Sequence, residues 1–249
     1  MNLFLFDVDG TLTIPQKEIE KKMILTLQSI KEKKTFQGKP FHLGFIGGSD
    51  FKKILFQLKE ENLDIFDWRL SENGLVTYFK NELVHFKTFI EHLGEEKFQK
   101  LINIILKIFS EIEIPKKRGT FIENRKGMIN ISPIGRQCSQ EEREDFNHYD
   151  KQHHIRPNII KKFNSLWKDD TIPLKCSIGG QISIDIFPDG WDKTYYLDEL
   201  FKKYENIYFF GDKVTEGGND YEIYNDPRIK GFHVTSPDDT ISILMKLFP

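Results

Sequence analysis

The sequence is short of several residue types and patterns, and each shortage argues against a class of protein. The 249 residues include two cysteines, Cys138 and Cys176, too few for a disulfide framework and not spaced as a metal-binding pair. Alanine is absent altogether, which we interpret as compositional bias rather than function. The net charge of −2 argues against a general nucleic-acid-binding protein. No targeting segment and no apolar window of about 18 residues is present, so we expect a cytoplasmic protein without nucleic-acid or membrane partners.

The segments that are present predict two domains. Twenty-two phenylalanines can fill a core although hydrophobic residues make up only 39% of the chain. Strand-like and helix-like segments alternate up to about residue 81 and again after residue 187, which favours an α/β domain with a parallel or mixed sheet. Between them, long helices and two strand pairs favour an α+β insert with an antiparallel sheet. The predicted domains are residues 1–81 with 187–249, and the insert 82–186.

The clearest chemical signal is the stretch LFLFDVDGTLT at residues 3–13. Four apolar residues of a buried strand run directly into Asp7 and Asp9, which project to the same side of an extended chain. Two neighbouring carboxylates repel each other and are costly to desolvate. A polar turn at Asp9 and Gly10 is one interpretation, and a metal-assisted pair at the carboxyl end of a parallel strand is the other.

Polar residues at other predicted strand ends favour the second interpretation. Ser49 follows a strand in FIGGSD, and Lys193 opens the helix predicted after FPDGWD. Asp212 ends the strand IYFFGD, and Asn219 and Asp220 follow a glycine-rich bend. Because the carboxyl ends of parallel strands share one edge of a sheet, we expect these groups to converge. Carboxylates with a cation, a hydroxyl and an ammonium group suit phosphoryl transfer, with a carboxylate as nucleophile.

In chain order, DVDGT, Ser49, Lys193 and GD…GGND resemble the four motifs of the haloacid dehalogenase superfamily of phosphotransferases. NISPIGR and ISIDIFPDGWDKTY are more specific and are similar to eukaryotic-type phosphomannomutases, and this resemblance spans essentially the whole chain. It implies a Rossmann-like core of the haloacid dehalogenase type with an inserted α+β cap. It also implies an isomerase that interconverts mannose 6-phosphate and mannose 1-phosphate for GDP-mannose synthesis, and that often accepts glucose phosphates. The implied cofactors are Mg²⁺ and a hexose 1,6-bisphosphate primer, and the implied assembly is a homodimer formed through the cap.

The resemblance also assigns roles to the residues at the strand ends. Asp7 would be the nucleophile and Asp9 the general acid and base. Ser49 and Lys193 would hold the transferring phosphate. Mg²⁺, which prefers oxygen ligands, would be held by Asp7, the main-chain carbonyl of Asp9, and Asp212. Further metal-binding or supporting positions are Asn219, Asp220, Tyr224 and Asp226.

Two positions depart from the family pattern. The family has an arginine where this chain has Gln16, followed here by Lys17, so one phosphate contact is either weakened or supplied by the lysine. A second cation site of the family would fall at Tyr224, Asp226 and residue 229, where Ile229 replaces the usual threonine. The loss of that side-chain oxygen leaves the second cation an open question.

A mutase must also hold the phosphate that is not being transferred, and arginine suits this task because its planar guanidinium binds phosphate through two hydrogen bonds. The resemblance assigns this role to Arg125, Arg136 and Arg143 of the insert, although surface arginines more often pair with nearby acids. In QISIDIF, a period of two places Gln181, Ser183 and Asp185 on one face. That face suits either solvent or sugar hydroxyls, and the family uses the positions of Ser183 and Asp185 for the sugar.

Two alternative functions remain open. A sugar-phosphate phosphatase of the same superfamily would share the chemistry at Asp7 but pass the phosphate to water. A binding or regulatory protein with an inactive site is disfavoured because Asp7, Asp9, Lys193 and Asp212 are all present. A preference for mannose or glucose phosphates depends on the configuration of one hydroxyl and does not follow from the sequence.

Overall fold

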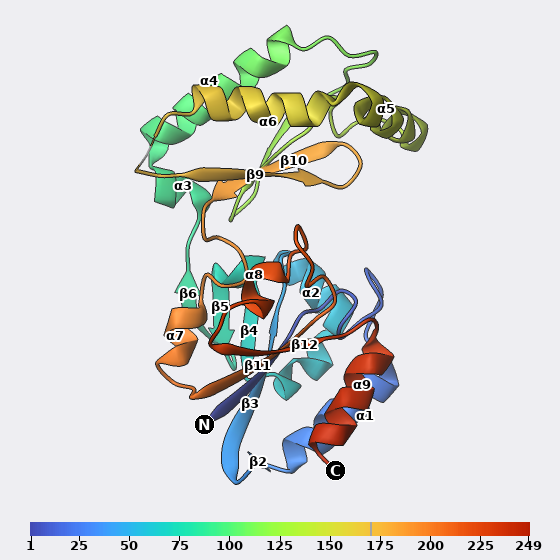
Figure 1. Ribbon diagram of the computed structural model, residues 1–249, viewed down its shortest axis with the longest axis vertical. Helices are drawn as coiled ribbons and strands as arrows, with labels where there is room; N and C mark the ends of the chain where they lie inside the picture. The colour runs from blue at the N-terminus through green and yellow to red at the C-terminus, as the bar shows by residue number, and fades with distance from the viewer. Residues whose placement is uncertain (170) are drawn as a thin grey trace. The chain divides into compact units, whose positions relative to one another are not determined.

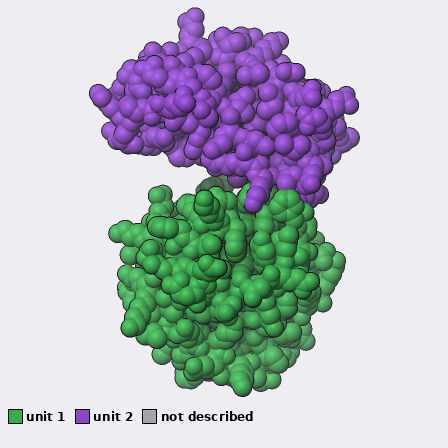
Figure 2. Space-filling model, turned by 180° about the vertical axis from the view of Figure 1, so that it is seen from behind, with its two compact units in different colours: residues 1–86, 190–249 green, residues 87–189 purple. Residues whose placement is uncertain are grey.

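The computed structural model describes residues 1–169 and 171–249, and the chain divides into two compact units (Figures 1 and 2). The first unit comprises Met1–Phe86 and Gly190–Pro249, and the second comprises Lys87–Asp189. The predicted boundaries, 81/82 and 186/187, are therefore a few residues too early. At the first boundary the cause is strand β6 (Glu82–Phe86), which pairs with β5 (Val76–Phe79) and belongs to the sheet of the first unit.

The first unit is built on a mixed sheet with the strand order β12-β11-β1-β3-β4-β5-β6, and β2 pairs with β3. The five strands from β12 to β4 run parallel to one another, as the alternation of strands and helices predicts, whereas β5 is antiparallel to β4 and β6 is antiparallel to β5. The elements of this unit other than β5 and β6 are β1 (Asn2–Phe6), α1 (Lys21–Glu32), β2 (Thr35–Phe36), β3 (Lys39–Ile46), α2 (Phe51–Leu58), the 3₁₀ segments η1 (Glu60–Ile65) and η2 (Glu72–Gly74), β4 (Trp68–Ser71), α7 (Leu197–Phe201), β11 (Asn206–Gly211), α8 (Tyr221–Tyr224), β12 (Ile229–His233) and α9 (Pro237–Leu247).

Strand β1 is buried on both faces, which explains its unbroken apolar run. Phe4 and Phe6 pack with side chains of α1 and α9, the two helices that lie side by side in Figure 1. Leu3 and Leu5 pack on the opposite face with residues of α7. Each of these side chains contributes roughly 1.5–3 kcal/mol through burial. The strand that leads directly to Asp7 is therefore held firmly in the centre of the sheet.

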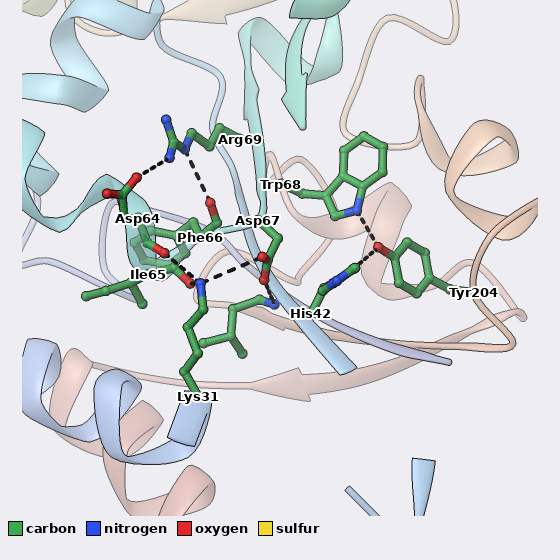
Figure 3. A network of polar contacts seen from close by, with 10 residues as sticks. Lys31, His42, Asp64, Ile65, Phe66, Asp67, Trp68, Arg69 and Tyr204 are labelled. Atoms are coloured by element: carbon green, nitrogen blue, oxygen red, sulfur yellow. Dashed lines mark hydrogen bonds and ion pairs between the residues drawn. The ribbon is translucent and has the colours of Figure 1, made fainter. Parts of the chain in front are cut away.

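A polar network connects distant segments of the first unit around the start of β4 (Figure 3). The Tyr204 hydroxyl lies 2.6 Å from His42 Nδ1 and accepts a hydrogen bond from Trp68 Nε1 at 2.5 Å. Lys31 Nζ donates to the carbonyl oxygens of Asp64 and Ile65, at 2.6 and 2.9 Å. Burial raises the pKa of Tyr204 to about 12 and lowers the pKa of His42, so both groups are neutral at neutral pH. We assign this network a structural role.

The second unit contains an antiparallel sheet with the strand order β7-β8-β10-β9, and helices α4 and α6 lie together on one side of it (Figure 1). This arrangement confirms the prediction of an α+β insert. A capping box at Ser139 and Glu142 begins the helix that follows the sheet's first hairpin. The elements of this unit are α3 (Phe89–Leu93), α4 (Glu95–Glu111), β7 (Ile122–Asn124), β8 (Ile129–Ile131), α5 (Gln140–His153), α6 (Ile155–Leu166), β9 (Leu174–Gly179) and β10 (Ser183–Pro188).

Within the two described ranges, no helix combines the length and the apolar character needed to cross a bilayer.

Candidate active site

Three carboxylates meet at the carboxyl edge of the sheet in the first unit. Asp7 directly follows β1, and Asp212 directly follows the parallel neighbour β11. Asp220 immediately precedes α8. One carboxylate oxygen from each of these residues lies within 4.8 Å of the other two. The structure thus brings Asp7 and Asp212 together and adds Asp220, for which the sequence supported only an auxiliary position.

Lys193 is the cation of this cluster. Its side chain is fully buried, and its Nζ donates hydrogen bonds to Asp7 Oδ1 and, at 2.5 Å, to Asp220 Oδ1. The prediction that Lys193 begins a helix is wrong, because α7 begins at Leu197. The Asp192 carboxylate accepts a hydrogen bond from the Thr194 backbone N–H at 2.8 Å, and such a local turn competes with the helix.

The cluster carries more negative than positive charge. Burial raises the pKa of Asp7 to about 7, Lys193 opposes this shift, and the neighbouring charge of Asp220 adds to it. Burial and Asp220 also raise the pKa of Asp212. Burial would lower the pKa of Lys193, but its two acidic neighbours outweigh that effect and raise it. Only one buried ammonium group, with the exposed Lys213 opposing the pKa shift of Asp212, therefore balances three acids, and a further positive charge is needed to keep all of them ionised.

The residues present fit a Mg²⁺ ion. Asp212 Oδ1 is buried and has no hydrogen-bond partner in the part of the chain that the structure describes. The donor set consists of carboxylate oxygens, which Mg²⁺ prefers. Gly10 allows the turn after Asp9 to lie close to the Asp212 carboxylate, since a Cβ on Gly10 would lie 2.3 Å from Asp212 Oδ2. The φ angle of Gly10 is +87°, which also favours glycine. Asp7, Asp212 and Asp220 would hold the ion, with the Asp9 carbonyl as the further ligand that the resemblance implies.

The Asp9 side chain points to different partners. Its Oδ1 accepts hydrogen bonds from the Gln16 backbone N–H at 2.7 Å and from Gln57 Nε2 at 2.8 Å. Lys53 Nζ lies 3.9 Å from Asp9 Oδ2 and 3.2 Å from Ser49 Oγ. Asp9 and Ser49 are thus linked through one ammonium group at the start of α2. Gln16 takes part through its backbone only, and the exposed Lys17 side chain makes no hydrogen bond or ion pair within residues 1–169 and 171–249.

Gln57 and Lys53 were not predicted from the sequence. Gln57 is 1% exposed although it is polar. It falls on the buried face of α2, with Ile54 three residues before it and Leu58 one residue after it. An amide on the apolar face of a short helix is the signal that could have identified it. Lys53 lies four residues after Ser49, within the first turn of the helix, a spacing that brings side chains together.

The remaining predicted metal or supporting positions lie in other surroundings. Asn219 is exposed, and the Asp226 carboxylate is engaged by Arg228 at 2.7 Å, a hydrogen bond that lowers the pKa of Asp226. Tyr224 and Ile229 pack against the apolar cluster around Leu3 and Leu5. These contacts give no support to a second cation site, and Ile229 offers only a hydrocarbon side chain there.

Two of the three predicted arginines of the second unit share one carboxylate. Arg125 Nη2 lies 2.7 Å from Glu123 Oε2, and Arg136 Nε lies 3.3 Å from the same oxygen. Arg143 lies in the first turn of α5, and its guanidinium forms no hydrogen bond or ion pair with the described residues. Arg125 in the turn of the first hairpin and Arg136 after its second strand therefore form one positively charged group around Glu123, an acid that was not predicted.

The predicted polar row of QISIDIF is partly corrected by the structure. Strand β10 begins at Ser183, so Gln181 lies in the turn before it and the alternation of faces does not extend to it. The Ser183 hydroxyl donates to the Gly179 carbonyl at 2.8 Å, which fixes the end of the hairpin. Asp185 lies on the same face as Ser183, and its Oδ1 accepts a hydrogen bond from Asn130 Nδ2 at 2.6 Å.

Comparison with known sequences points to one family. A family model described as eukaryotic phosphomannomutase matches residues 27–249. A phosphomannomutase of Dendrobium officinale is 50% identical over 96% of this chain and 90% of its own length. A phosphomannomutase of Saccharomyces cerevisiae is 49% identical over 99% and 94%. Phosphomannomutase 1 of Dictyostelium discoideum is 50% identical over 98% and 95%.

Comparison with solved structures concerns the fold. A haloacid dehalogenase-like hydrolase from Bacteroides thetaiotaomicron aligns with a TM-score of 0.59 over 99% of both chains, at 14% identity. A trehalose-6-phosphate phosphatase of Aspergillus fumigatus aligns with a TM-score of 0.59 over 99% of this chain and 92% of its own, also at 14% identity. These likenesses confirm the predicted haloacid dehalogenase fold and carry no information on the substrate.

Proposed function

This chain belongs to the eukaryotic phosphomannomutase family, and from that premise we propose that it interconverts mannose 6-phosphate and mannose 1-phosphate. The reaction proceeds through an aspartyl-phosphate on Asp7. The observation that carries this proposal is the buried Asp7 carboxylate, bonded to Lys193 and within 4.8 Å of Asp212 and Asp220. A nucleophile, a fixed ammonium group and a set of oxygen ligands are the parts that phosphoryl transfer needs.

Within the first unit, each residue has a task in the transfer. Asp7 attacks the phosphoryl group, and Lys193, already bonded to Asp7, neutralises charge on the phosphoryl oxygens. Ser49 and its neighbour Lys53 hold a phosphate oxygen. Asp9 gives a proton to the leaving sugar oxygen and later takes one from the attacking hydroxyl. Mg²⁺, when bound by Asp7, Asp212 and Asp220, supplies positive charge to the phosphate.

The second unit would bind the phosphate that stays on the sugar. Arg125 and Arg136 both form ion pairs with one carboxylate oxygen of Glu123, and Arg143 has no such partner among the described residues. A dianionic phosphate can take the place of the Glu123 carboxylate and accept bidentate hydrogen bonds from these arginines. Ser183, Asp185 and the turn residue Gln181 would meet the sugar hydroxyls. Retention of the second phosphate is the property that separates a mutase from a phosphatase.

A hexose 1,6-bisphosphate would act as primer. Asp7 must carry a phosphate before it can give one to a monophosphate substrate, and the bisphosphate supplies it. Transfer to the free hydroxyl of mannose 1-phosphate regenerates a bisphosphate, which returns its other phosphate to Asp7. The product would supply GDP-mannose synthesis in the cytoplasm, and glucose phosphates are further candidate substrates.

Phosphorus NMR with mannose 1-phosphate, in the presence and absence of primer, tests this proposal. We expect primer-dependent formation of mannose 6-phosphate and little inorganic phosphate. Asp7→Asn should lower turnover by at least about 10³-fold, because the amide is a poor nucleophile. Primer-independent release of inorganic phosphate as the main reaction would favour a sugar-phosphate phosphatase instead.

The proposal extends to assembly as a homodimer through the second unit. A hollow of about 440 Å³ in this unit has apolar side chains of Pro115, Ile134, Phe146 and Tyr149 in its lining. Apolar surface of this kind supports a protein contact. Sedimentation velocity should give the mass of two chains, and Tyr149→Arg should shift the protein to one.

A further inference from the structure

A polar row crosses three strands of the sheet in the second unit. Glu123 on β7, Asn130 on β8 and Asp185 on β10 lie directly opposite one another in the strand register. The neighbours of Asn130 along its strand, Ile129 and Ile131, are buried. They project to the opposite face because side chains alternate along a strand. Asn130 is therefore the polar position of an otherwise apolar strand, and it lies between two acidic residues.

The Asn130 amide uses both of its ends. Its Oδ1 accepts a hydrogen bond from Arg136 Nη1 at 2.6 Å, and its Nδ2 donates to Asp185 Oδ1 at 2.6 Å. The residue is 2% exposed. Because one partner can only donate and the other, as a carboxylate, can only accept, the orientation of the amide is determined by its contacts.

The contacts continue beyond Asn130. Arg136 Nε lies 3.3 Å from Glu123 Oε2, the oxygen that also accepts hydrogen bonds from Arg125 Nε and Nη2 at 3.1 and 2.7 Å. A continuous chain of polar contacts thus leads from Arg125 through Glu123, Arg136 and Asn130 to Asp185. A displacement of Arg136 cannot leave Asp185 unaffected unless a hydrogen bond of the buried amide is broken, and a buried unsatisfied amide is unfavourable.

We propose that Asn130 is a positioning residue that couples Arg136 to Asp185, so that binding of phosphate by the arginine orients the carboxylate for the sugar. This inference rests on the proposed function, which takes Arg136 as a phosphate ligand and Asp185 as a sugar ligand. A purely structural asparagine would stabilise the sheet without making the two ligands depend on each other.

Two substitutions separate these roles. Asn130→Asp keeps the size of the side chain and an acceptor for Arg136, but places a carboxylate against Asp185. Asn130→Leu removes both hydrogen bonds. Asn158→Asp is the matched control, because Asn158 is an exposed asparagine of the same unit whose side chain donates only a weak hydrogen bond of 3.5 Å to the His153 carbonyl.

The measurement is a double-mutant cycle on mannose 1-phosphate binding by calorimetry, with the Mg²⁺-loaded full chain. In the wild type, the effects of Arg136→Ala and Asp185→Ala should be non-additive by at least about fivefold in Kd. In the Asn130→Leu background the two effects should multiply. Asn130→Asp should weaken binding roughly tenfold, whereas Asn158→Asp should leave it unchanged. Unchanged non-additivity in the Asn130→Leu background would overturn the inference.

Nitrogen-15 NMR of chains that retain Asn130 keeps the test decisive if an Asn130 variant fails to fold. Mannose 1-phosphate and the Asp185→Asn substitution should each shift the side-chain amide signal of Asn130, and an unmoved signal in both cases contradicts the coupling. Failure of the proposed function would be visible elsewhere, as absence of mutase turnover or as unchanged binding in both Arg136→Ala and Asp185→Ala.

Discussion

Asp7 combines full burial with the need to be ionised when it acts as a nucleophile. Burial raises its pKa to about 7, and the single ammonium group of Lys193 is shared with Asp220. At the scale of single residues, a divalent cation among Asp7, Asp212 and Asp220 would resolve this conflict. Binding or removal of the cation should therefore change the protonation of Asp7.

The first prediction concerns protons and Mg²⁺, which compete for Asp7. Since the pKa of Asp7 in the metal-free protein is about 7, the affinity for Mg²⁺ should fall on acidification below that value, by roughly tenfold between pH 8 and pH 6. Calorimetry in buffers of different ionisation enthalpy should also detect a proton released on binding. Equal affinity at both pH values, without proton release, would contradict the assignment.

The raised pKa of Asp7 also determines how the stability of the metal-free protein changes with pH. The folded state binds the Asp7 proton more tightly than the unfolded chain, whose pKa is 3.8. The contribution of this group to the free energy of unfolding is therefore present at low pH and lost as the pH rises from about 4 to about 7. Asp7→Asn, which carries no titrating proton at this position, is the control for both measurements.

The second prediction concerns Gln57, which donates a hydrogen bond to Asp9 without belonging to the acidic cluster. Gln57→Leu should lower kcat roughly tenfold, because a hydrogen bond to a charged group contributes about 1.5 kcal/mol or more. KM should change little, since Gln57 is buried and holds Asp9 rather than substrate. Steady-state kinetics checks this split.

Asn62→Leu serves as the control for Gln57. Asn62 is another buried amide nearby in the chain, but its hydrogen bond goes to the Leu58 carbonyl rather than to Asp9. It should reduce stability without the loss of kcat. If both substitutions changed kcat equally, the role of Gln57 in positioning Asp9 would be refuted.

Whether a site residue can be predicted from the sequence depends on how far apart in the chain its contacts lie. Asp7, Lys193 and Asp212 could be found because each lies in a motif at or near a strand end. Open α/β sheets place their active sites at the carboxyl ends of the strands. Gln57 and Asn130 contact residues 48 and 55 positions away in sequence, Asp9 and Asp185 respectively. Nothing local marks those contacts except one polar residue in an apolar pattern.

Helix ends show at the scale of elements how well local chemistry can be predicted. Helix α9 has Ser236 as its N-cap and Pro237 as its first residue, and both residue types are favoured at those positions. The helix predicted to begin at Lys193 begins instead at Leu197, the first residue of α7, because the Asp192 side chain stabilises a turn before it. A helix cap depends on a few neighbouring residues and can be predicted from them. A turn stabilised by a side chain competes with the helix, and which of the two forms is harder to predict.

The third prediction concerns the cap of α9. The Ser236 hydroxyl accepts a hydrogen bond from the Asp239 N–H at 3.3 Å, and Thr240 in the same turn donates to the Thr11 carbonyl of the DGT turn at 2.9 Å. Ser236→Ala should lower the free energy of unfolding by about 1 kcal/mol, which corresponds to roughly 2–4 °C in Tm. Thermal unfolding followed by circular dichroism measures this.

Ser242 provides the comparison on the same helix. It is exposed within α9, and Ser242→Ala should be neutral or slightly stabilising because alanine has the higher helix propensity. An equal loss of stability in both variants would show that Ser236 does not act through the cap.

At the scale of the whole molecule, the division into a core and an insert is visible in the sequence because the change from alternating strands and helices to paired strands is a local pattern. The exception is β6, which the sequence places in the insert. Leu83, Val84 and Phe86 of this strand are exposed, and none of its residues is fully buried. Such an edge strand has little hydrophobic periodicity, so only its pairing with β5 reveals it.

Both units are needed for the function proposed, since one would carry the nucleophile and the other the clamp for the second phosphate. The most direct test of this account follows the phosphoryl group from radiolabelled hexose 1,6-bisphosphate during turnover of unlabelled mannose 1-phosphate. The account predicts that the label enters the hexose monophosphates and that Arg136→Ala diverts part of it to inorganic phosphate. Label that passes directly to inorganic phosphate in the unaltered protein would contradict it.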